Sequence, residues 1–332
     1  MSALLSISGL IKHFPIRSGL FGRPNAVVRA VDGVTFDVAS SETLGMVGES
    51  GCGKSTTARL LIGLIRSDAG KIMFANRTIG ENLTLAELRR GVQMVFQDSY
   101  ASLNPRLTIE DSIAFGPKVH GTPDAKARAL ARDLMGKVGL ESARFAGRYP
   151  HELSGGQRQR VNIARALAIS PRIVILDEAV SALDKSVEAQ VLNLLLDLKA
   201  EFGLTYVFIS HDLNVVRYVS DRVMVMYLGE VVEIGPVEDI YATPRHPYTR
   251  ALLTAMPSMD PDARTEEAPL SGDPPNPINP PSGCRFHTRC PYAEPVCSQA
   301  NPGLYVTGAA GHLAACHMNI PASGHSKARA AA

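Results

Sequence analysis

The stretch Gly48-Glu49-Ser50-Gly51-Cys52-Gly53-Lys54-Ser55-Thr56 matches the phosphate-loop pattern G-x-x-x-x-G-K-[ST]. It follows an apolar run at residues 43–47 and precedes a helix-like run at residues 58–65. A strand, a glycine-rich loop and a helix in this order direct backbone N–H groups and the positive end of the helix toward one anion. We therefore expect Lys54 to reach the β- and γ-phosphates of a bound nucleotide and Ser55 to ligate Mg²⁺. The alternative, a glycine-rich turn with an incidental lysine, does not account for the flanking elements.

The composition of the chain excludes several kinds of protein. Its 332 residues include 34 Lys+Arg and 32 Asp+Glu, a net charge of +2 that is too small for the basic surface of a nucleic-acid-binding protein. A mean hydropathy of +0.03, without an apolar run near about 18 residues, predicts no membrane-spanning helix. Residues 1–10 lack the features of a secretory signal. We expect a soluble, cytosolic chain of roughly two domains, with any membrane role supplied by a partner.

Three zones of the chain differ in their apolar pattern. Residues 4–98 predict short strands and turns around one helix, with alternating apolar residues at 34, 36 and 38. Residues 99–169 predict helices, since apolar side chains after Pro123 recur on one helical face (Ala127, Leu130, Ala131, Leu134 and Val138). From 172 to about 235, apolar strands at 173–176, 206–210 and 223–227 alternate with a helix near 187–202. This alternation predicts an α/β fold with a parallel sheet covered on both faces.

Two further stretches fit a nucleotide site. The strand at 173–176 ends in Asp177 and Glu178, which we expect to hold Mg²⁺ and to position an attacking water, respectively. An ordinary strand with a polar edge is the alternative. Leu153-Ser154-Gly155-Gly156-Gln157 precedes a helical run at 158–169, so Ser154 or a glycine could cap a second anion-binding helix. A helix cap with no ligand is the alternative there.

These motifs together resemble the ATP-binding subunits of ABC transporters, over residues 4 to about 255. Residues 48–56 are similar to the Walker A loop, and Gln97 is similar to the Q-loop glutamine. Residues 153–157 are similar to the LSGGQ motif, and Asp177 and Glu178 are similar to the Walker B pair. Residues 181–184 are similar to the D-loop, which ends at Asp184, and His211 is similar to the switch histidine. Ala179 departs from the family, which usually has proline there, and we expect only a less stiff turn. The resemblance implies a P-loop ATPase cassette with a mixed sheet core, an antiparallel β subdomain and an α-helical subdomain.

The resemblance also implies a mechanism. Two such subunits close head to tail, and each ATP lies between one Walker A loop and the partner's LSGGQ motif. Ser154, Gly155, Gly156 and Gln157 would then contact the γ-phosphate bound to the opposite subunit. His211 would contact the γ-phosphate of its own subunit, and Gln97 would sense the metal and the nucleotide. An aromatic residue near the N-terminus usually stacks on adenine in this family, and Phe14 is the candidate, with a packed core phenylalanine as the alternative.

The C-terminal part narrows the family. Residues 277–284 and 286–291, with 246–252 before them, closely resemble the extension of oligopeptide and dipeptide importer ATPases. The motif 153–160, with Gln157 where D-type subunits more often have Met, is similar to the F-type subunit (DppF- or OppF-like). The implied partners are a D-type ATPase subunit, two transmembrane permeases and, indirectly, an extracytoplasmic peptide-binding protein. The implied location is peripheral, on the cytoplasmic face of the inner membrane. The cargo stays open.

Other classes of ABC protein fit less well. A non-transport ABC ATPase that serves a soluble enzyme complex, as in phosphonate breakdown, would generally end near residue 255. A DNA-repair or ribosome factor would need long insertions or two tandem cassettes. We therefore divide the chain into an ABC ATPase domain at 1–255, with a helical subdomain at about 99–169, a C-terminal extension at 256–320 and a disordered tail at 321–332.

Four of the five cysteines lie in the extension. Cys284, Cys290, Cys297 and Cys316 are spaced C-x5-C-x6-C-x18-C, which is not the paired spacing of a zinc ribbon, although His287, His312 and His317 are near in sequence. A cytosolic location argues against disulfides. Four thiolates could hold a [4Fe–4S] cluster, as related extensions in peptide importers are thought to do. Zinc and plain structural cysteines are the alternatives. Such a cluster would hold together a segment with eight prolines between 257 and 282, which has too little core to fold alone.

Overall fold

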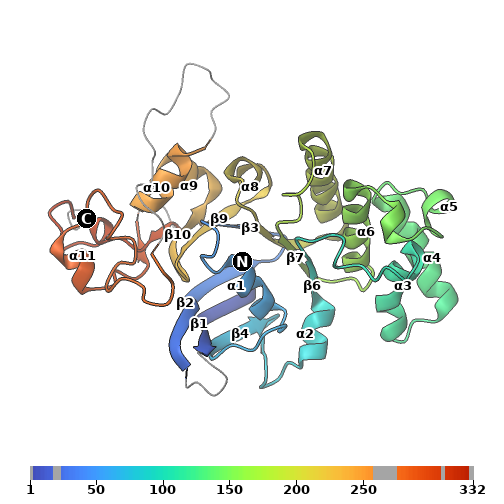
Figure 1. The fold of residues 1–332 in the computed structure, drawn as a ribbon, viewed down its shortest axis with the longest axis horizontal. Helices are drawn as coiled ribbons and strands as arrows, with labels where there is room; N and C mark the ends of the chain where they lie inside the picture. The colour runs from blue at the N-terminus through green and yellow to red at the C-terminus, as the bar shows by residue number, and fades with distance from the viewer. Residues whose placement is uncertain (1–2, 18–23, 257–274, 308–310, 329–332) are drawn as a thin grey trace. The chain divides into compact units, whose positions relative to one another are not determined.

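The computed structural model describes residues 3–17, 24–256, 275–307 and 311–328, drawn as ribbon in Figure 1. Its elements fall into two compact units. One unit comprises Met1–Leu4, Val38–Thr43 and Phe74–Ser210, and the other comprises Leu5–Asp37, Leu44–Met73 and His211–Ala332. Among the described residues, no helix is both long enough and apolar enough to cross a bilayer.

The first unit contains three parallel strands. They lie in the order β8 (Thr205–Ile209), β7 (Ile173–Asp177) and β6 (Val92–Val95). Every residue of β7 and β8 is buried, which is the pattern of strands covered on both faces. Helix α7 (Lys185–Phe202) connects β7 to β8. The strands predicted at 173–176 and 206–210 and the helix predicted near 187–202 are thereby confirmed.

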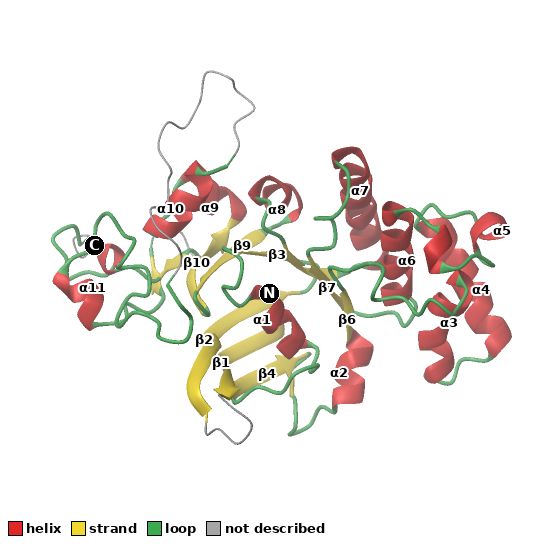
Figure 2. Ribbon diagram, viewed as in Figure 1, coloured by secondary structure: helices red, strands yellow, loops and turns green. Residues whose placement is uncertain are grey.

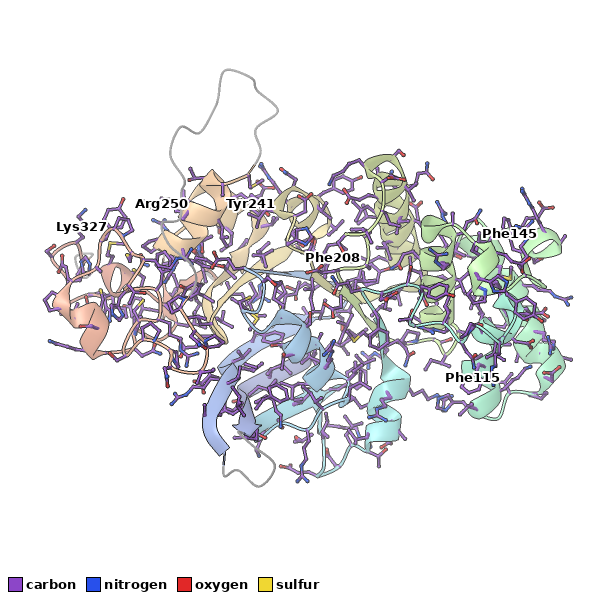
Figure 3. The ribbon with its side chains drawn as sticks, in the orientation of Figure 1. Phe115, Phe145, Phe208, Tyr241, Arg250 and Lys327 are labelled. Atoms are coloured by element: carbon purple, nitrogen blue, oxygen red, sulfur yellow. The ribbon has the colours of Figure 1, made fainter. Side chains whose placement is uncertain are left out.

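The zone predicted to be helical contains helices α3, α4, α5 and α6, which lie together in the same unit (Figure 1), and a 3₁₀ turn. They are α3 (Ile109–Val119), α4 (Asp124–Lys137), α5 (Ser142–Phe145), the 3₁₀ turn η1 (Pro150–Glu152) and α6 (Gly155–Leu167). The predicted face of α4 is buried at Ala127, Ala131, Leu134 and Val138, while Leu130 stays partly exposed. Phe145 is also buried, whereas Phe115 of α3 is 58% exposed (Figure 3).

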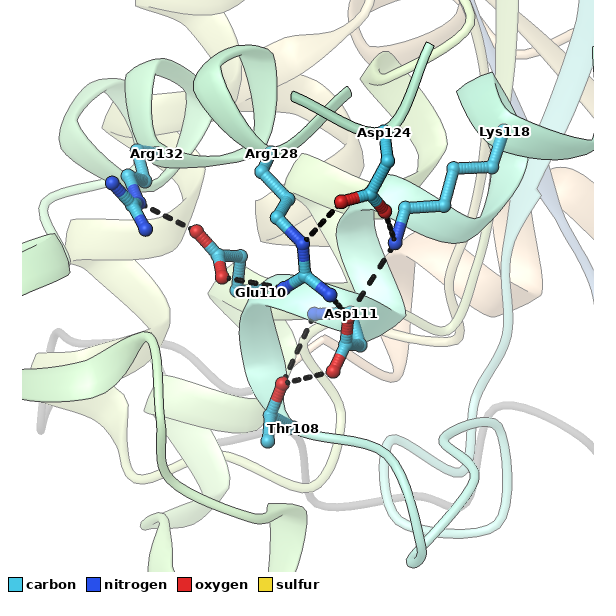
Figure 4. Close-up of polar contacts among 7 residues, drawn as sticks. All are labelled: Thr108, Glu110, Asp111, Lys118, Asp124, Arg128 and Arg132. Atoms are coloured by element: carbon cyan, nitrogen blue, oxygen red, sulfur yellow. Dashed lines mark hydrogen bonds and ion pairs between the residues drawn. The ribbon is translucent and has the colours of Figure 1, made fainter. Parts of the chain in front are cut away.

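A charge network joins α3 to α4 (Figure 4). The carboxylate of Glu110, which is buried, receives Arg128 Nη1 at 2.8 Å and Arg132 Nε at 2.5 Å. Arg128 also contacts Asp111 at 2.8 Å and Asp124 at 2.9 Å. Hydrogen bonds to Asp124 and Glu110 raise the pKa of Arg128 above its ordinary value, so this guanidinium stays charged. The network ties the first turn of α3 to the first three turns of α4.

The second unit contains most of a sheet with the strand order β2 (Pro24–Ala39), β1 (Ala3–Arg17) and β4 (Ala69–Phe74), drawn side by side in Figure 2. The alternating residues Val34, Phe36 and Val38 of β2 are buried.

The N-terminal zone differs from the sequence prediction of short strands around one helix. Its first two strands have 15 and 16 residues, and it contains α2 (Leu85–Gly91) and β5 (Arg77–Thr78) besides α1 (Lys54–Leu61). Helix α2 begins at a capping box of Thr84 and Glu87, which the apolar pattern alone does not reveal.

The second unit also contains a mixed group of strands. Strand β3 (Thr43–Val47) is parallel to β9 (Arg222–Tyr227), and β9 is antiparallel to β10 (Glu230–Pro236). Beyond β10 follow β12 (Leu313–Ala314) and β11 (Tyr305–Val306), both antiparallel to their neighbours. The C-terminal extension therefore adds strands to the sheet, because Leu313 pairs with Ile234 of β10. The remaining helical segments are α8 (Leu213–Val219), α9 (Val237–Ala242), α10 (Pro247–Thr254), α11 (Pro295–Gln299) and η2 (His317–Asn319).

Part of the C-terminal tail, for which the sequence predicts disorder, is described by the structure. Residues 321–328 form hydrogen-bonded turns: Ser323 Oγ donates to the His317 carbonyl at 2.7 Å, and His325, which is buried, pairs through Nε2 with the Tyr292 carbonyl at 2.8 Å. Polar side chains of the described tail residues thus bond to backbone groups of the extension. Residues 329–332, and 257–274 of the proline-rich stretch, lie outside the described residues.

Candidate nucleotide-binding site

The phosphate loop runs from the end of β3 into α1, as its sequence predicts. Gly53 occupies the N-cap of α1 with φ 110°, and Gly48 has φ 147°. Residues other than glycine rarely adopt these backbone conformations. A Cβ added at Gly48 would lie 2.2 Å from the Met226 carbonyl oxygen, and one at Gly53 would lie 2.3 Å from the Ala30 carbonyl oxygen. Both glycines are therefore required by backbone conformation and by close packing.

Lys54 is buried and directed into its own loop. Its ammonium donates to the Gly48 carbonyl at 2.7 Å and to the Glu49 carbonyl at 3.0 Å, and lies 3.7 Å from Cys52 Sγ. Burial raises the pKa of the Cys52 thiol, so this cysteine stays protonated and packs in the loop. Ser55 and Thr56 follow in the first turn of α1, while Ser50 and Gly51 are exposed at the tip.

Three residues that were not predicted as site residues hold this loop. Tyr248 Oη accepts a hydrogen bond from the Glu49 N–H at 2.8 Å, and the Glu49 carboxylate receives the Arg289 guanidinium at 2.8 and 3.2 Å. The Gly229 N–H donates to the Cys52 carbonyl at 2.9 Å. Tyr248 and Arg289 belong to the stretches 246–252 and 286–291 of the resemblance, but nothing in the sequence links either residue to the loop.

The two carboxylates lie at the end of β7 in the first unit. Asp177 is buried as the last strand residue. Glu178 follows with φ 48°, a left-handed conformation uncommon for a glutamate, and its N–H donates to the Ile209 carbonyl at 3.0 Å. Gln97 Nε2 donates to Glu178 Oε2 at 2.8 Å, so the structure brings these two predicted residues together. Ala179 next to them is buried.

The LSGGQ stretch begins α6. Ser154 is the N-cap, and it forms a capping box with Gln157: Ser154 Oγ accepts from the Gln157 N–H at 3.3 Å, while the Ser154 N–H donates to Gln157 Oε1 at 3.0 Å. A Cβ added at Gly156 would lie 2.5 Å from Val187 of α7, and one at Gly155 would lie 3.7 Å from Leu183. The start of α6 thus packs against the segment that ends at Asp184, the N-cap of α7.

His211 and Phe14 belong to the second unit, as the phosphate loop does. His211 is exposed directly before Asp212, whose carboxylate caps α8 by accepting from the Asn214 N–H at 2.9 Å. Phe14 is 38% exposed on β1, and the Lys12 ammonium lies 5.4 Å from the centroid of its ring. Gln97, Asp177, Glu178, the LSGGQ stretch and Asp184 belong to the first unit.

The four cysteines of the extension line one small cavity, together with Phe286 and His325. Burial raises the pKa of Cys284 to about 11 and that of Cys316 to about 12, so both are neutral thiols. Among the described residues, no group of three or more His, Cys, Asp or Glu side chains is arranged to hold a metal ion. The nearby histidines are bonded elsewhere: His312 to Glu233, His317 to the Ala300 carbonyl and His287 to the Cys284 carbonyl. The described side chains as they stand therefore form neither the predicted iron–sulfur site nor the alternative zinc site.

Two family models match this chain. The one described as ABC transporter matches residues 31–181, and the one described as oligopeptide/dipeptide transporter, C-terminal region, matches residues 232–297. Two solved structures have the same fold. CbiO1 from Clostridium perfringens, part of the ABC transporter complex cbiONQ, has a TM-score of 0.63 at 26% identity and covers 73% of this chain and 92% of its own. The ATP-binding cassette MJ0796, a dimer bound to ADP and Pi, has a TM-score of 0.60 at 28% identity, over 70% of this chain and 98% of its own.

These structures confirm the predicted fold class, the mixed α/β cassette of P-loop ABC ATPases, and leave the extension rich in Cys and Pro unaddressed.

Relatives match over nearly the whole chain. Oligopeptide transport ATP-binding protein AppF of Bacillus subtilis is 49% identical over 95% of this chain and 97% of its own. Oligopeptide transport ATP-binding protein OppF of Salmonella typhimurium is 48% identical over 94% of this chain and 95% of its own. With this identity and both family regions, the chain belongs to the ATP-binding proteins of ABC transporters that carry the oligopeptide/dipeptide transporter C-terminal region.

Proposed function

We propose that this chain binds and hydrolyses ATP to power an ABC importer of peptides, dipeptides or oligopeptides. The observation that carries the proposal is the phosphate loop with its buried Lys54, in a chain that also carries the oligopeptide/dipeptide transporter C-terminal region. That region favours the importer over a non-transport ABC ATPase of a soluble enzyme complex. The names of relatives such as AppF and OppF, both oligopeptide transport ATP-binding proteins, support the same substrate class.

The triphosphate would bind along the loop formed by Gly48, Glu49, Ser50, Gly51, Cys52, Gly53, Lys54, Ser55 and Thr56. Its backbone N–H groups and the start of α1 provide the positive potential, and Lys54 would exchange its loop carbonyls for phosphate oxygens. The residue types of Ser55, Gln97 and Asp177 suit Mg²⁺, which prefers hard oxygen ligands. The ion supplies neutralisation of phosphate charge in this chemistry. Phe14 is the proposed stacking partner of adenine.

Hydrolysis requires a positioned water more than it requires a strong base. Glu178 is the proposed residue that orients this water, and its hydrogen bond with Gln97 supports a fixed carboxylate orientation. His211 is proposed to contact the γ-phosphate. Ser154, Gly155, Gly156 and Gln157 are proposed to face the γ-phosphate of a partner subunit, with Asp184 beside them, because the capped start of α6 presents backbone N–H groups.

The assembly that we propose follows from the same family. The chain acts as the F-type subunit beside a D-type ATPase, on two permeases at the cytoplasmic face of the membrane, with a peptide-binding protein outside. Residues 1–255 form the ATPase domain, with a helical subdomain at about 99–169, and 256–320 form the extension. Co-expression and purification test this assembly. Recovery with two multi-span permeases and peptide-stimulated ATP hydrolysis supports the proposal, and recovery with soluble enzymes alone contradicts it.

A [4Fe–4S] cluster in the extension is proposed on one ground, that four cysteines line one cavity. The side chains as they stand do not form a ligand set, so binding would require the thiols to converge and lose their protons. Anaerobic purification followed by iron, sulfide and zinc analysis tests it. About four irons and four sulfides per chain support the cluster. A metal-free protein with a fully folded extension rejects both the cluster and zinc.

A further inference from the structure

The side chain of one arginine of the extension reaches the phosphate loop. Arg289 lies in the turn between Cys284 and Cys290, and its two terminal nitrogens contact the two carboxylate oxygens of Glu49 at 2.8 and 3.2 Å. The two residues are 240 positions apart in the sequence. The Arg289 side chain is 6% exposed and that of Glu49 is 23% exposed, so this two-pronged pair is largely shielded from water. Such paired geometry fixes orientation as well as distance.

The arginine also contacts one member of an aromatic cluster, Tyr227. Arg289 Nη1 lies 3.4 Å from Tyr227 Oη, and its guanidinium carbon lies 6.0 Å from the centre of that ring. The Tyr227 ring packs against Tyr248 at 4.6 Å and against Phe286 of the extension at 5.4 Å, between centroids. Tyr248 in turn accepts the Glu49 N–H. Glu49 is thus fixed by two groups, its backbone by Tyr248 and its carboxylate by Arg289.

The position of Glu49 matters because its carbonyl oxygen accepts a hydrogen bond from the Lys54 ammonium at 3.0 Å. A rotation of the Glu49 peptide would move both this carbonyl and the N–H groups next to it in the loop. Phosphate binding by such a loop depends on several backbone N–H groups that point at one anion. When groups that position a substrate shift by about 1 Å, the protein loses much of the free energy that correct positioning provides.

We propose that Arg289 is a positioning residue for ATP binding, which holds the phosphate loop through Glu49 so that Lys54 and the loop N–H groups face the phosphates. The C-terminal extension is thereby a working part of the nucleotide site as well as an addition to the sheet. This inference rests on the proposed ATP-binding function. It concerns a residue that touches neither ATP nor the reacting atoms, so its effect is on affinity through loop geometry.

The test compares the full-length chain with four variants: Arg289→Met, Glu49→Gln, the double variant and Arg289→Lys. The Kd of a fluorescent ATP analogue is measured at fixed Mg²⁺, and thermal unfolding is followed without nucleotide. We expect Arg289→Met and Glu49→Gln each to raise the Kd roughly tenfold. The Kd of the double variant should not exceed that of the poorer single variant, because both changes remove the same interaction. Arg289→Lys keeps the charge but loses the two-pronged geometry, and we expect an intermediate Kd.

Controls separate this inference from the function on which it rests. Arg250→Met, at an exposed position of α10, is expected to bind like the unmodified chain (Figure 3 labels Arg250). If Lys54→Ala binds the analogue as tightly as the unmodified chain, the proposed ATP site fails. If Lys54→Ala loses binding while Arg289→Met and Glu49→Gln change only the unfolding midpoint, the positioning role alone is overturned. Should Arg289→Met not fold, the nearly isosteric Glu49→Gln gives the same decision.

Discussion

Gln97 Nε2 donates to Oε2 of Glu178 across 2.8 Å, and this contact joins the segments that follow two neighbouring parallel strands. Both residues lie at the carboxyl ends of β6 and β7, where the edge of a parallel sheet collects polar side chains. The backbone of Glu178 is left-handed, with φ 48°, and is tied to the Ile209 carbonyl. A glutamate held in an uncommon backbone conformation, with its carboxylate oriented by an amide, is suited to hold a water in one position.

Replacement of Glu178 by glutamine should separate ATP binding from hydrolysis. The amide keeps the size of the side chain but cannot orient or polarise a water as a carboxylate does. We expect Glu178→Gln to bind ATP with an unchanged Kd and to lose at least about 100-fold in kcat. The rate of phosphate release by the assembled complex and a parallel binding titration give both numbers. Glu141→Gln, an exposed glutamate of the same unit, should change neither. Steady turnover by Glu178→Gln would remove Glu178 from this role.

Removal of the Lys54 ammonium should act on binding itself. Lys54 is buried with its nitrogen in the loop, so alanine removes the one side-chain cation within residues 48–56. We expect Lys54→Ala to weaken the Kd of an ATP analogue by about tenfold or more, since charge-assisted bonds to phosphate are strong. Titration of the analogue by fluorescence measures this. Lys126→Ala, on the exposed side of α4, should bind normally. Equal affinity of the two variants would contradict the assignment of Lys54.

Two helix caps of the same chemistry allow a matched test of the LSGGQ stretch. Ser154 caps α6 and Thr84 caps α2, each in a capping box with the residue three positions later. Ser154→Ala and Thr84→Ala should each lower the stability of their helix by about 1 kcal/mol. Only Ser154→Ala should also lower the ATPase rate of the assembled complex, because only this helix start is proposed to face a phosphate. Hydrogen exchange at each helix and phosphate release measure the two effects. Similar ATPase rates for both variants would leave Ser154 with a structural role alone.

Local sequence patterns predicted the parts of the fold that depend on near neighbours. The strand at 43–47 and the loop at 48–56 lie where the sequence placed them, because apolar runs and loop glycines act over a few residues. The helical run predicted at 158–169 begins at Gly155, because Ser154, one of the caps that the sequence offered, is the N-cap. Contacts of high sequence separation were missed. The pair of Glu49 with Arg289 is specified by the course of the chain through the sheet, and neither residue type is unusual for a surface.

In the charge network between α3 and α4, loss of the Glu110 charge should lower the stability of the two helices, whereas loss of the Asp124 charge should not (Figure 4). Glu110 is 7% exposed and receives two guanidinium groups, whereas the Asp124 side chain is 61% exposed. Glu110→Gln keeps the shape but removes the buried negative charge, and leaves Arg128 and Arg132 without their shared partner. We expect this change to lower the opening free energy of α3 and α4 by about 1–3 kcal/mol. Asp124→Asn should have little effect, because exposed ion pairs contribute little. Hydrogen exchange of the two helices measures both variants, and equal protection in both would show that burial of Glu110 does not strengthen its pairs.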